Sequence, residues 1–154
     1  MPKSPRIEED DDDLALDTPE LDDADEDNSG TNAPEGGRVI RSRGLKFPFD
    51  TNILKPRIRQ SLKTNGYERK ESDAVTRIVK SEDRVLELGG GIGYMSTLIA
   101  KNCGAEVFSY EGNPGLIPYI ERVHELNGVT GKAHITHALI GPRKSTAKFY
   151  VRGN

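Results

Sequence analysis

The chain has 154 residues, a length that suits one domain of ordinary size, and a formal net charge of −3. Its single cysteine, Cys103, excludes an intramolecular disulfide and a cysteine metal cluster, and it favours a reduced, cytoplasmic setting. No apolar run approaches the roughly 18 residues that a membrane helix needs, and the first residues do not resemble a signal peptide, so we expect neither membrane insertion nor export.

The charge is divided unevenly along the chain. Residues 1–37 contain 14 acidic and two basic residues, a net charge of −12, whereas the remainder contains 11 acidic and 20 basic residues, a net charge of +9. Because segment 1–37 has few apolar side chains to bury, we predict a disordered acidic tail that solubilises the chain or contacts a basic partner. The basic remainder lacks a recognisable nucleic-acid motif, which argues against nucleic acid as a partner.

Residues 38–80 are predicted to form a helical and extended cover for the domain that follows. Pro48 keeps the apolar segment 45–50 out of a helix and indicates an extended conformation. Apolar residues recur at helical spacing over 53–62, with Pro56 near the first turn, and again over 68–80. Asn65-Gly66 marks a turn between the two predicted helices.

Residues 81–154 alternate between short apolar strands and amphipathic helices. This alternation predicts an α/β fold with a parallel sheet and right-handed crossovers. His124, on a helix rich in charge, is expected to face solvent. The predicted strands are 84–88, 105–111, 133–140 and 147–151, and the predicted helices are 95–103, ending at Gly104, and 116–126, ending at Asn127-Gly128.

A glycine-rich loop, Glu87-Leu88-Gly89-Gly90-Gly91-Ile92-Gly93, stands between the first of these strands and the helix after it. Glycines allow a sharp turn there and let a cofactor lie against bare backbone. Glu87 stands at the carboxyl end of the strand, where open sheets bind ligands. A dinucleotide loop has the spacing G-x-G-x-x-G, and Tyr94 takes the place of its third glycine, which argues against a nicotinamide-dependent oxidoreductase.

A second acidic residue, Glu111, ends the next predicted strand, 18 residues after Gly93. In dinucleotide folds a carboxylate at this place accepts hydrogen bonds from both hydroxyls of a ribose. Together, the alternating glycines, Glu87 and Glu111 predict a cofactor that carries a nucleoside.

Five segments, in this order, resemble the FkbM-type family of S-adenosylmethionine-dependent methyltransferases. They are V-L-E-L-G-G-G-I-G-Y-M-S at 85–96, E-G-N-P at 111–114, E-L-N-G-V at 125–129, A-L-I-G at 138–141 and A-K-F-Y-V at 147–151. Tyr67-Glu68-x-x-Glu71 resembles, more loosely, the segment before the first motif. The resemblance implies a Rossmann-like, class I methyltransferase three-layer fold. It also implies that this fold is incomplete at the C-terminus, because the family's next strand, with an acidic K-x-D-x-E-G motif, is absent.

The resemblance also implies a cofactor, S-adenosylmethionine, and a set of contacts with it. Glu87 would bind near the amino group of its methionine part, and Glu111 would hold the ribose hydroxyls. Gly112-Asn113 would lie beside the adenosine, and His137-Ala138 would contact the adenine. The resemblance identifies no catalytic residue and no metal ligand in this chain. The predicted cofactor site consists of Glu87, Gly89, Gly90, Gly91, Ile92, Gly93, Glu111, Gly112, Asn113, His137 and Ala138.

The resemblance implies methyl transfer to a hydroxyl oxygen of a small molecule or sugar. Residues 81–154 would be the cofactor-binding half of this enzyme. Its first strand would then lack a neighbour on one side, so we expect either a missing C-terminal half or a second chain to complete the sheet. The alternative is a catalytically inactive fragment, or a binding and regulatory remnant that needs a partner chain.

Overall fold

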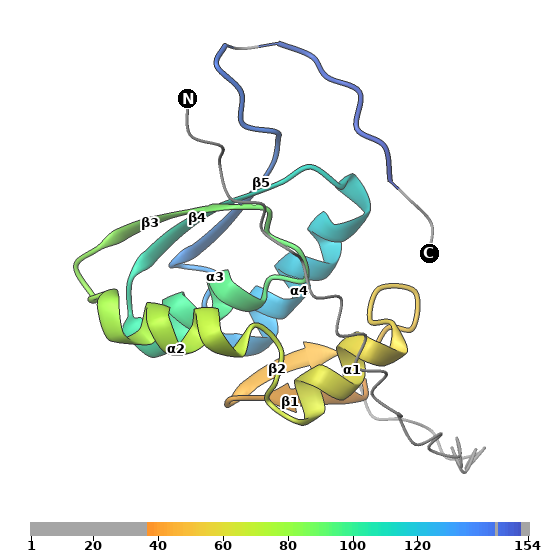
Figure 1. Cartoon of the computed structure of the whole chain (residues 1–154), viewed down its shortest axis with the longest axis vertical. Coiled ribbons are helices and arrows are strands. Elements are labelled where there is room, and N and C mark those ends of the chain that lie inside the picture. The colour runs from red at the N-terminus through yellow and green to blue at the C-terminus, as the bar shows by residue number, and fades with distance from the viewer. Residues whose placement is uncertain (1–36, 144, 152–154) are drawn as a thin grey trace, which may run out of the picture. The chain divides into compact units, whose positions relative to one another are not determined.

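The computed structural model describes residues 37–143 and 145–151 (Figure 1). The predicted acidic tail, residues 1–37, lies outside the described residues except for Gly37. No helix within the described ranges is long and apolar enough to span a membrane.

The described chain begins with an antiparallel hairpin of strands β1 (Val39–Ser42) and β2 (Leu45–Pro48). The two residues between them, Arg43 and Gly44, have φ angles of 47° and 79°, and two positive φ values are typical of the tightest hairpin turn. The inward side chains of both strands are buried. The extended segment predicted at 45–50 is therefore confirmed as a strand, while its partner β1 was not predicted.

Two helices follow the hairpin, α1 (Pro56–Lys63) and α2 (Arg69–Ile78). Pro56 occupies the first turn of α1, where its missing N–H costs no hydrogen bond. Asn65 has a φ of 56° in the turn between the helices. Both predicted helices are confirmed, with ends that differ by a few residues from the predicted ones.

The remaining elements form a parallel α/β unit, as predicted. Its three-stranded sheet has the order β3-β4-β5, and both strand pairs are parallel. The strands are β3 (Arg84–Leu88), β4 (Glu106–Glu111) and β5 (Ala133–His137). Helix α3 (Tyr94–Leu98) continues as a π-helical turn, η1 (Ile99–Cys103). Helix α4 (Ile117–Asn127) follows a 3-10 turn, η2 (Pro114–Leu116).

Two predictions about the end of the chain are wrong. The third strand ends at His137 and not at Ile140. The predicted fourth strand, 147–151, is not a strand, because no strand lies beside it to exchange backbone hydrogen bonds. High β-propensity alone is thus not enough to form a strand at 147–151, because a strand needs a neighbouring strand to pair with.

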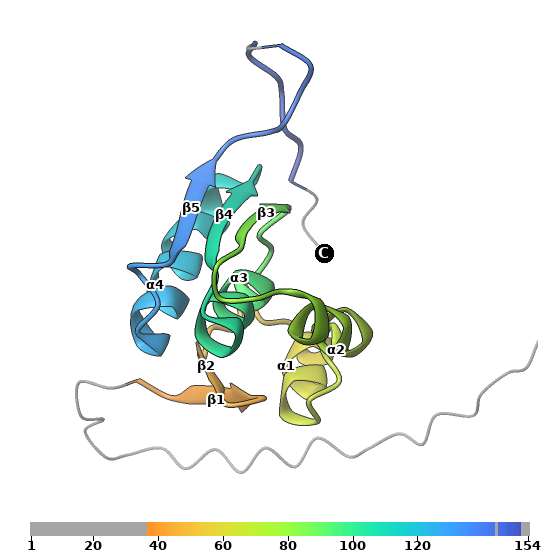
Figure 2. The same ribbon diagram turned by 90° about the vertical axis from the view of Figure 1, so that its left-hand side faces the viewer.

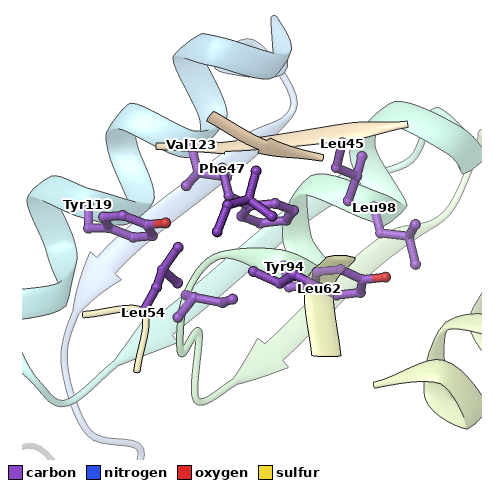
Figure 3. Close-up of a cluster of buried hydrophobic side chains, with 10 residues drawn as sticks. Leu45, Phe47, Leu54, Leu62, Tyr94, Leu98, Tyr119 and Val123 are labelled. Atoms are coloured by element: carbon purple, nitrogen blue, oxygen red, sulfur yellow. The ribbon is translucent and has the colours of Figure 1, made fainter. Parts of the chain in front are cut away.

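The helices α2, α3 and α4 cover one face of the sheet, and the hairpin and α1 lie on the far side of this helix layer (Figure 2). Between the sheet and the helices, Val107 and Ala133 pack against Ile99 and Ala100. Between the helices and the hairpin, Phe47 is buried and stacks on Tyr94, with ring centroids 5.6 Å apart (Figure 3). The helix layer therefore has an apolar core on each side.

The opposite face of the sheet is uncovered in the described residues. Leu86 and Leu88 of β3 are 61% and 59% exposed, and the partly exposed Phe108 and Tyr110 of β4 stand beside them in register. Within the described chain, β3 pairs with β4 alone, so its other edge is free, as predicted. Of the three layers that the resemblance implied, the described residues contain the sheet and the helices of one face.

Candidate cofactor site

The glycine loop joins the carboxyl end of β3 to α3, and its backbone needs glycine at alternate positions. Gly89, Gly91 and Gly93 have φ angles of 88°, 55° and 72°, in the left-handed region that side chains disfavour. The amides of Gly89 and Gly90 donate to the carbonyl oxygen of Tyr110, at 2.8 and 3.2 Å. The loop is thereby fixed to the end of the neighbouring strand β4.

Gly90, which has an ordinary φ, is required by close packing. A Cβ atom at this position would lie 2.9 Å from Oγ of Ser109 and 3.4 Å from Cδ1 of Ile120. The loop therefore lies in van der Waals contact with β4 and α4, and only bare backbone fits between them.

Glu111 ends β4 and bridges two loops with its carboxylate. One oxygen accepts from the amide of Gly91 at 2.9 Å, and the other accepts from the amide of Asn113 at 2.7 Å. The backbone oxygen of Glu111 accepts from the amide of Ala138 at 3.1 Å. Glu111 is only 7% exposed, so these bonds form in a largely desolvated place. The predicted residues Gly91, Glu111, Asn113 and Ala138 are thus brought together.

Glu87 is the penultimate residue of β3 and lies on the face that the helices cover. Burial raises the pKa of this carboxyl to about 7, although the Ser109 hydroxyl that donates to it acts in the opposite direction. Glu68 adds a like charge that raises the pKa of Glu87 further. Near neutral pH, Glu87 is therefore a partly protonated acid for which a cation would be a favourable neighbour.

The segment before α2 reaches this end of the sheet. Glu68 precedes the first residue of α2 and has a φ of 43°, an uncommon backbone conformation for glutamate. Burial raises the pKa of Tyr67 to about 12, and the Tyr67 ring packs edge-on against Tyr94 with centroids 5.1 Å apart. Tyr67-Glu68-x-x-Glu71 is therefore a helix start that also adds a carboxylate to the surroundings of Glu87.

The predicted adenosine side lies around Gly112 and the end of β5. His137 Nε2 is 3.2 Å from the carbonyl oxygen of Gly112. An open cleft of about 770 Å³ extends from Gly112, His137 and Ala138 along the segment that follows β5. Leu139 and Phe149 of that segment lie so close to Gly112 that a Cβ there would be 2.6 Å from one and 2.9 Å from the other.

Sequence reasoning missed three polar residues beneath the loop, Ser96, Ser109 and His124. His124, expected to face solvent, is 2% exposed, and its Nε2 lies 3.1 Å from Oγ of Ser96. Burial lowers the pKa of His124 to about 4, so the ring is neutral at physiological pH. The charge-rich sequence around His124 concealed that it shares the buried stripe of Ile120 and Val123.

Ile92 was predicted as part of the cofactor site, but its side chain points away from the other residues of the glycine loop. Its side chain is buried in the core between the helices and the hairpin. Ile92 can therefore meet a cofactor only through its backbone.

Known proteins were compared with the chain. No family model and no curated protein matches the sequence. TYW2 from P. horikoshii, solved in complex with MeSAdo, matches with 21% identity over 66% of this chain and 35% of that chain, at a TM-score of 0.52. TYW2 from M. jannaschii, solved in complex with AdoMet, matches with 19% identity over 71% of this chain and 45% of that chain, at a TM-score of 0.50.

A looser match is a SAM-dependent methyltransferase from Thiobacillus denitrificans in complex with S-adenosyl-L-homocysteine, with 26% identity over 45% of this chain and 27% of that chain, at a TM-score of 0.41. The chain therefore spans less than half the length of each of these proteins. The α/β fold of the chain therefore resembles that of the two TYW2 proteins. No match identifies the FkbM family.

The packing of the glycine loop leads to a first prediction. Gly90→Ala should lower the free energy of unfolding by about 1–3 kcal/mol, because the added methyl overlaps Ser109 and must displace β4 or α4. Gly131→Ala is the matched control, since its methyl would meet nothing within 4 Å. Denaturant unfolding of both variants checks this, and equal stability of the two would contradict the close contact.

Proposed function

We propose that the described residues form the S-adenosylmethionine-binding half of a methyltransferase of the FkbM type. In this proposal, the complete enzyme transfers the methyl group to a hydroxyl oxygen of a small molecule or sugar. The observation that carries the proposal is the hydrogen bond of the Glu111 carboxylate. Glu111 ends β4, and its carboxylate holds the glycine loop that follows the neighbouring strand β3. Both parts of the predicted fingerprint are thereby joined at the same edge of the sheet.

The residues present fit the chemical groups of the cofactor. Glu111 uses one acceptor site on each oxygen for a backbone amide, and a carboxylate offers about four such sites, so capacity remains for two ribose hydroxyls. Glu87 offers the acid that the ammonium group of the methionine part requires. Leu139 and Phe149, beside Gly112, offer apolar surface for an adenine.

The glycine spacing and Tyr94 together disfavour a nicotinamide dinucleotide. Tyr94 stands where the dinucleotide fingerprint has its third glycine, and its side chain is 1% exposed in the core beside Phe47. The first residue of α3 therefore has a large side chain packed in the core, at the position where a pyrophosphate-binding loop has a glycine.

In this function the chain contributes binding and orientation. When bound, S-adenosylmethionine supplies a methyl group that its sulfonium already activates. The residues described here would fix the direction of the cofactor from both ends, through Glu87 and through Glu111. What remains for the enzyme is to align an acceptor oxygen with that methyl group. The groups that bind the acceptor and remove its proton belong outside this constellation.

Titration with S-adenosylhomocysteine tests the proposal. The full chain should bind it saturably, and Glu111→Ala should weaken binding tenfold or more, because hydrogen bonds to a charged acceptor contribute about 1.5–3 kcal/mol each. Glu121→Ala, an exposed acid of α4, is the control and should bind as the wild type does. Calorimetry checks this, with circular dichroism to verify folding. A folded wild type without binding, or unchanged binding by Glu111→Ala, would refute the proposed site.

The pKa of Glu87 predicts two pH effects of opposite sign. A raised pKa in the folded state means that the contribution of Glu87 to stability is complete below pH 4.5 and is lost as the pH rises through about 7. The melting temperature of the free chain should therefore fall between pH 6 and 8, more for the wild type than for Glu87→Gln. Affinity for S-adenosylhomocysteine should instead rise several-fold over this range, because its ammonium group prefers ionised Glu87, and Glu87→Gln should flatten the rise. Parallel pH profiles for wild type and variant would contradict this role.

The uncovered sheet face favours a second candidate function, that of a module that needs another polypeptide segment to become active. That segment would cover Leu86 and Leu88 and pair with the free edge of β3. Two leucines exposed by more than half on adjacent sites of one strand form an apolar patch that folded proteins usually cover. The covering segment would come from a second chain or from a C-terminal half.

The uncovered face can be tested on the chain by itself. The wild type should bind a hydrophobic dye and self-associate, and the double variant Leu86→Ser, Leu88→Ser should lose most of both effects while it keeps its helical circular dichroism. Ile78→Ser, which removes an even more exposed apolar side chain from α2, is the control. Sedimentation velocity and dye fluorescence check this, and a monomeric wild type without dye binding would contradict an unsatisfied face.

A further inference from the structure

A basic groove lies on the hairpin side of the molecule, away from the glycine loop. It has a volume of about 320 Å³ and runs between the outer face of the hairpin and α4. Four cationic side chains line it, Arg38, Arg41, Lys46 and Arg122, together with the apolar side chains of Val39, Pro48 and Leu126. Among the described residues, no acidic side chain lines the groove.

Two of these cations stand directly opposite each other in the hairpin. Arg41 of β1 is paired with Lys46 of β2, and both project from the face that points away from the core. Side chains at directly opposite positions are about 4.5–5.5 Å apart at Cβ, and like charges at such positions destabilise a strand pair. Arg41 and Lys46 thus repel each other across the hairpin. An acidic residue at either position would have formed an attractive pair instead.

The other charges do not relieve this repulsion within the described residues. Arg122 forms an ion pair with Glu125 on its own helix, at 3.1 Å, and this glutamate does not line the groove. The guanidinium of Arg38 lies over the Phe49 ring, 4.4 Å from its centroid. Among the described residues, no carboxylate forms an ion pair with Arg41 or Lys46.

The groove is also rigidly held. The backbone amide of Lys46 donates to Oδ1 of Asn127 at 2.9 Å, and Nδ2 of Asn127 donates to the carbonyl oxygen of Lys46 at 2.7 Å. Asn127 is itself buried at the end of α4, so both walls of the groove are joined by one side chain. Destabilising charge on a rigid support is typical of a binding site.

We propose that this groove binds a small organic phosphate, with its phosphate between Arg41 and Lys46 and its apolar body on Val39, Pro48 and Leu126. The charge argues for an anion, because a phosphate would turn the repulsion between the two cations into two charge-assisted hydrogen bonds. The volume suits a small molecule, since ligand pockets begin at about 300 Å³ and are mostly apolar with a few polar groups. This site is independent of the proposed methyltransferase function.

Phenyl phosphate serves as the probe for calorimetric titration of the full chain. It should bind saturably, at least tenfold more tightly than inorganic phosphate and than phenol, because only phenyl phosphate has both the charge and the apolar body. Lys46→Gln and Arg41→Gln should each weaken binding about tenfold, whereas Lys70→Gln, an exposed lysine of α2, should leave it unchanged.

The same variants distinguish a site from a merely solvated basic face. Lys46→Gln should raise the melting temperature of the free chain by removing the repulsion, and the further rise that phenyl phosphate gives should be smaller for this variant than for the wild type at the same ligand concentration. Absence of saturable binding, or equal binding by wild type and Lys46→Gln, would overturn the proposal. It would also be overturned if a short RNA bound in a Lys46-dependent way while phenyl phosphate did not, since the groove would then recognise a nucleic-acid backbone.

Discussion

The bridge that Glu111 makes between two loops is the interaction on which the candidate site depends. Parallel strands bring their carboxyl ends to one edge of a sheet, but strand pairing alone leaves the loops after them free to diverge. Here one buried carboxylate accepts from the loop after β3 and from the turn after β4, and the amides of Gly89 and Gly90 donate to the end of β4 as well. The loop after β3 and the turn after β4 are thus held together by the protein's own hydrogen bonds before any ligand arrives.

The helix layer supports the glycine loop because it packs against the sheet on one side and against the hairpin on the other. Ile120 of α4 holds the glycine loop from below, while Val123 and Tyr119 of the same helix pack against the hairpin. The Tyr119 hydroxyl donates to the carbonyl oxygen of Pro48 at 2.9 Å. A displacement of the hairpin would therefore be transmitted to the floor of the glycine loop through a single helix. Within the described part of the chain, nothing supports the other sheet face in this way, and the leucines of β3 remain exposed there.

The elements that the sequence predicted well are those whose signal is local. The glycine loop, both helices before it and the parallel sheet follow from periodicity, turn residues and alternation. The Arg43-Gly44 turn was available as a hairpin signal, but the short strand β1 before it, with Arg41 exposed and Ser42 buried, did not look apolar. The burial of His124 and the lack of pairing at 147–151 depend on tertiary contacts, which no local pattern contains. The hydrogen bonds of Glu111 to Gly91 and Asn113 likewise became visible only in three dimensions.

The two acids of the site differ in how the fold satisfies them, and this difference assigns their tasks. Glu111 ends β4 and accepts from two backbone amides. Glu87, one residue before the end of β3, has hydrogen bonds from Ser109 and Ser96, and the nearby charge of Glu68 raises its pKa. Backbone amides are fixed donors, so Glu111 is held in place whether or not a ligand is present. For Glu87, burial outweighs the hydrogen bonds from Ser109 and Ser96 and makes the ionised form costly, and a bound ammonium would offset that cost. In the proposed site, Glu111 would therefore hold the two loops together, and Glu87 would be the acid whose charge state a cationic ligand changes.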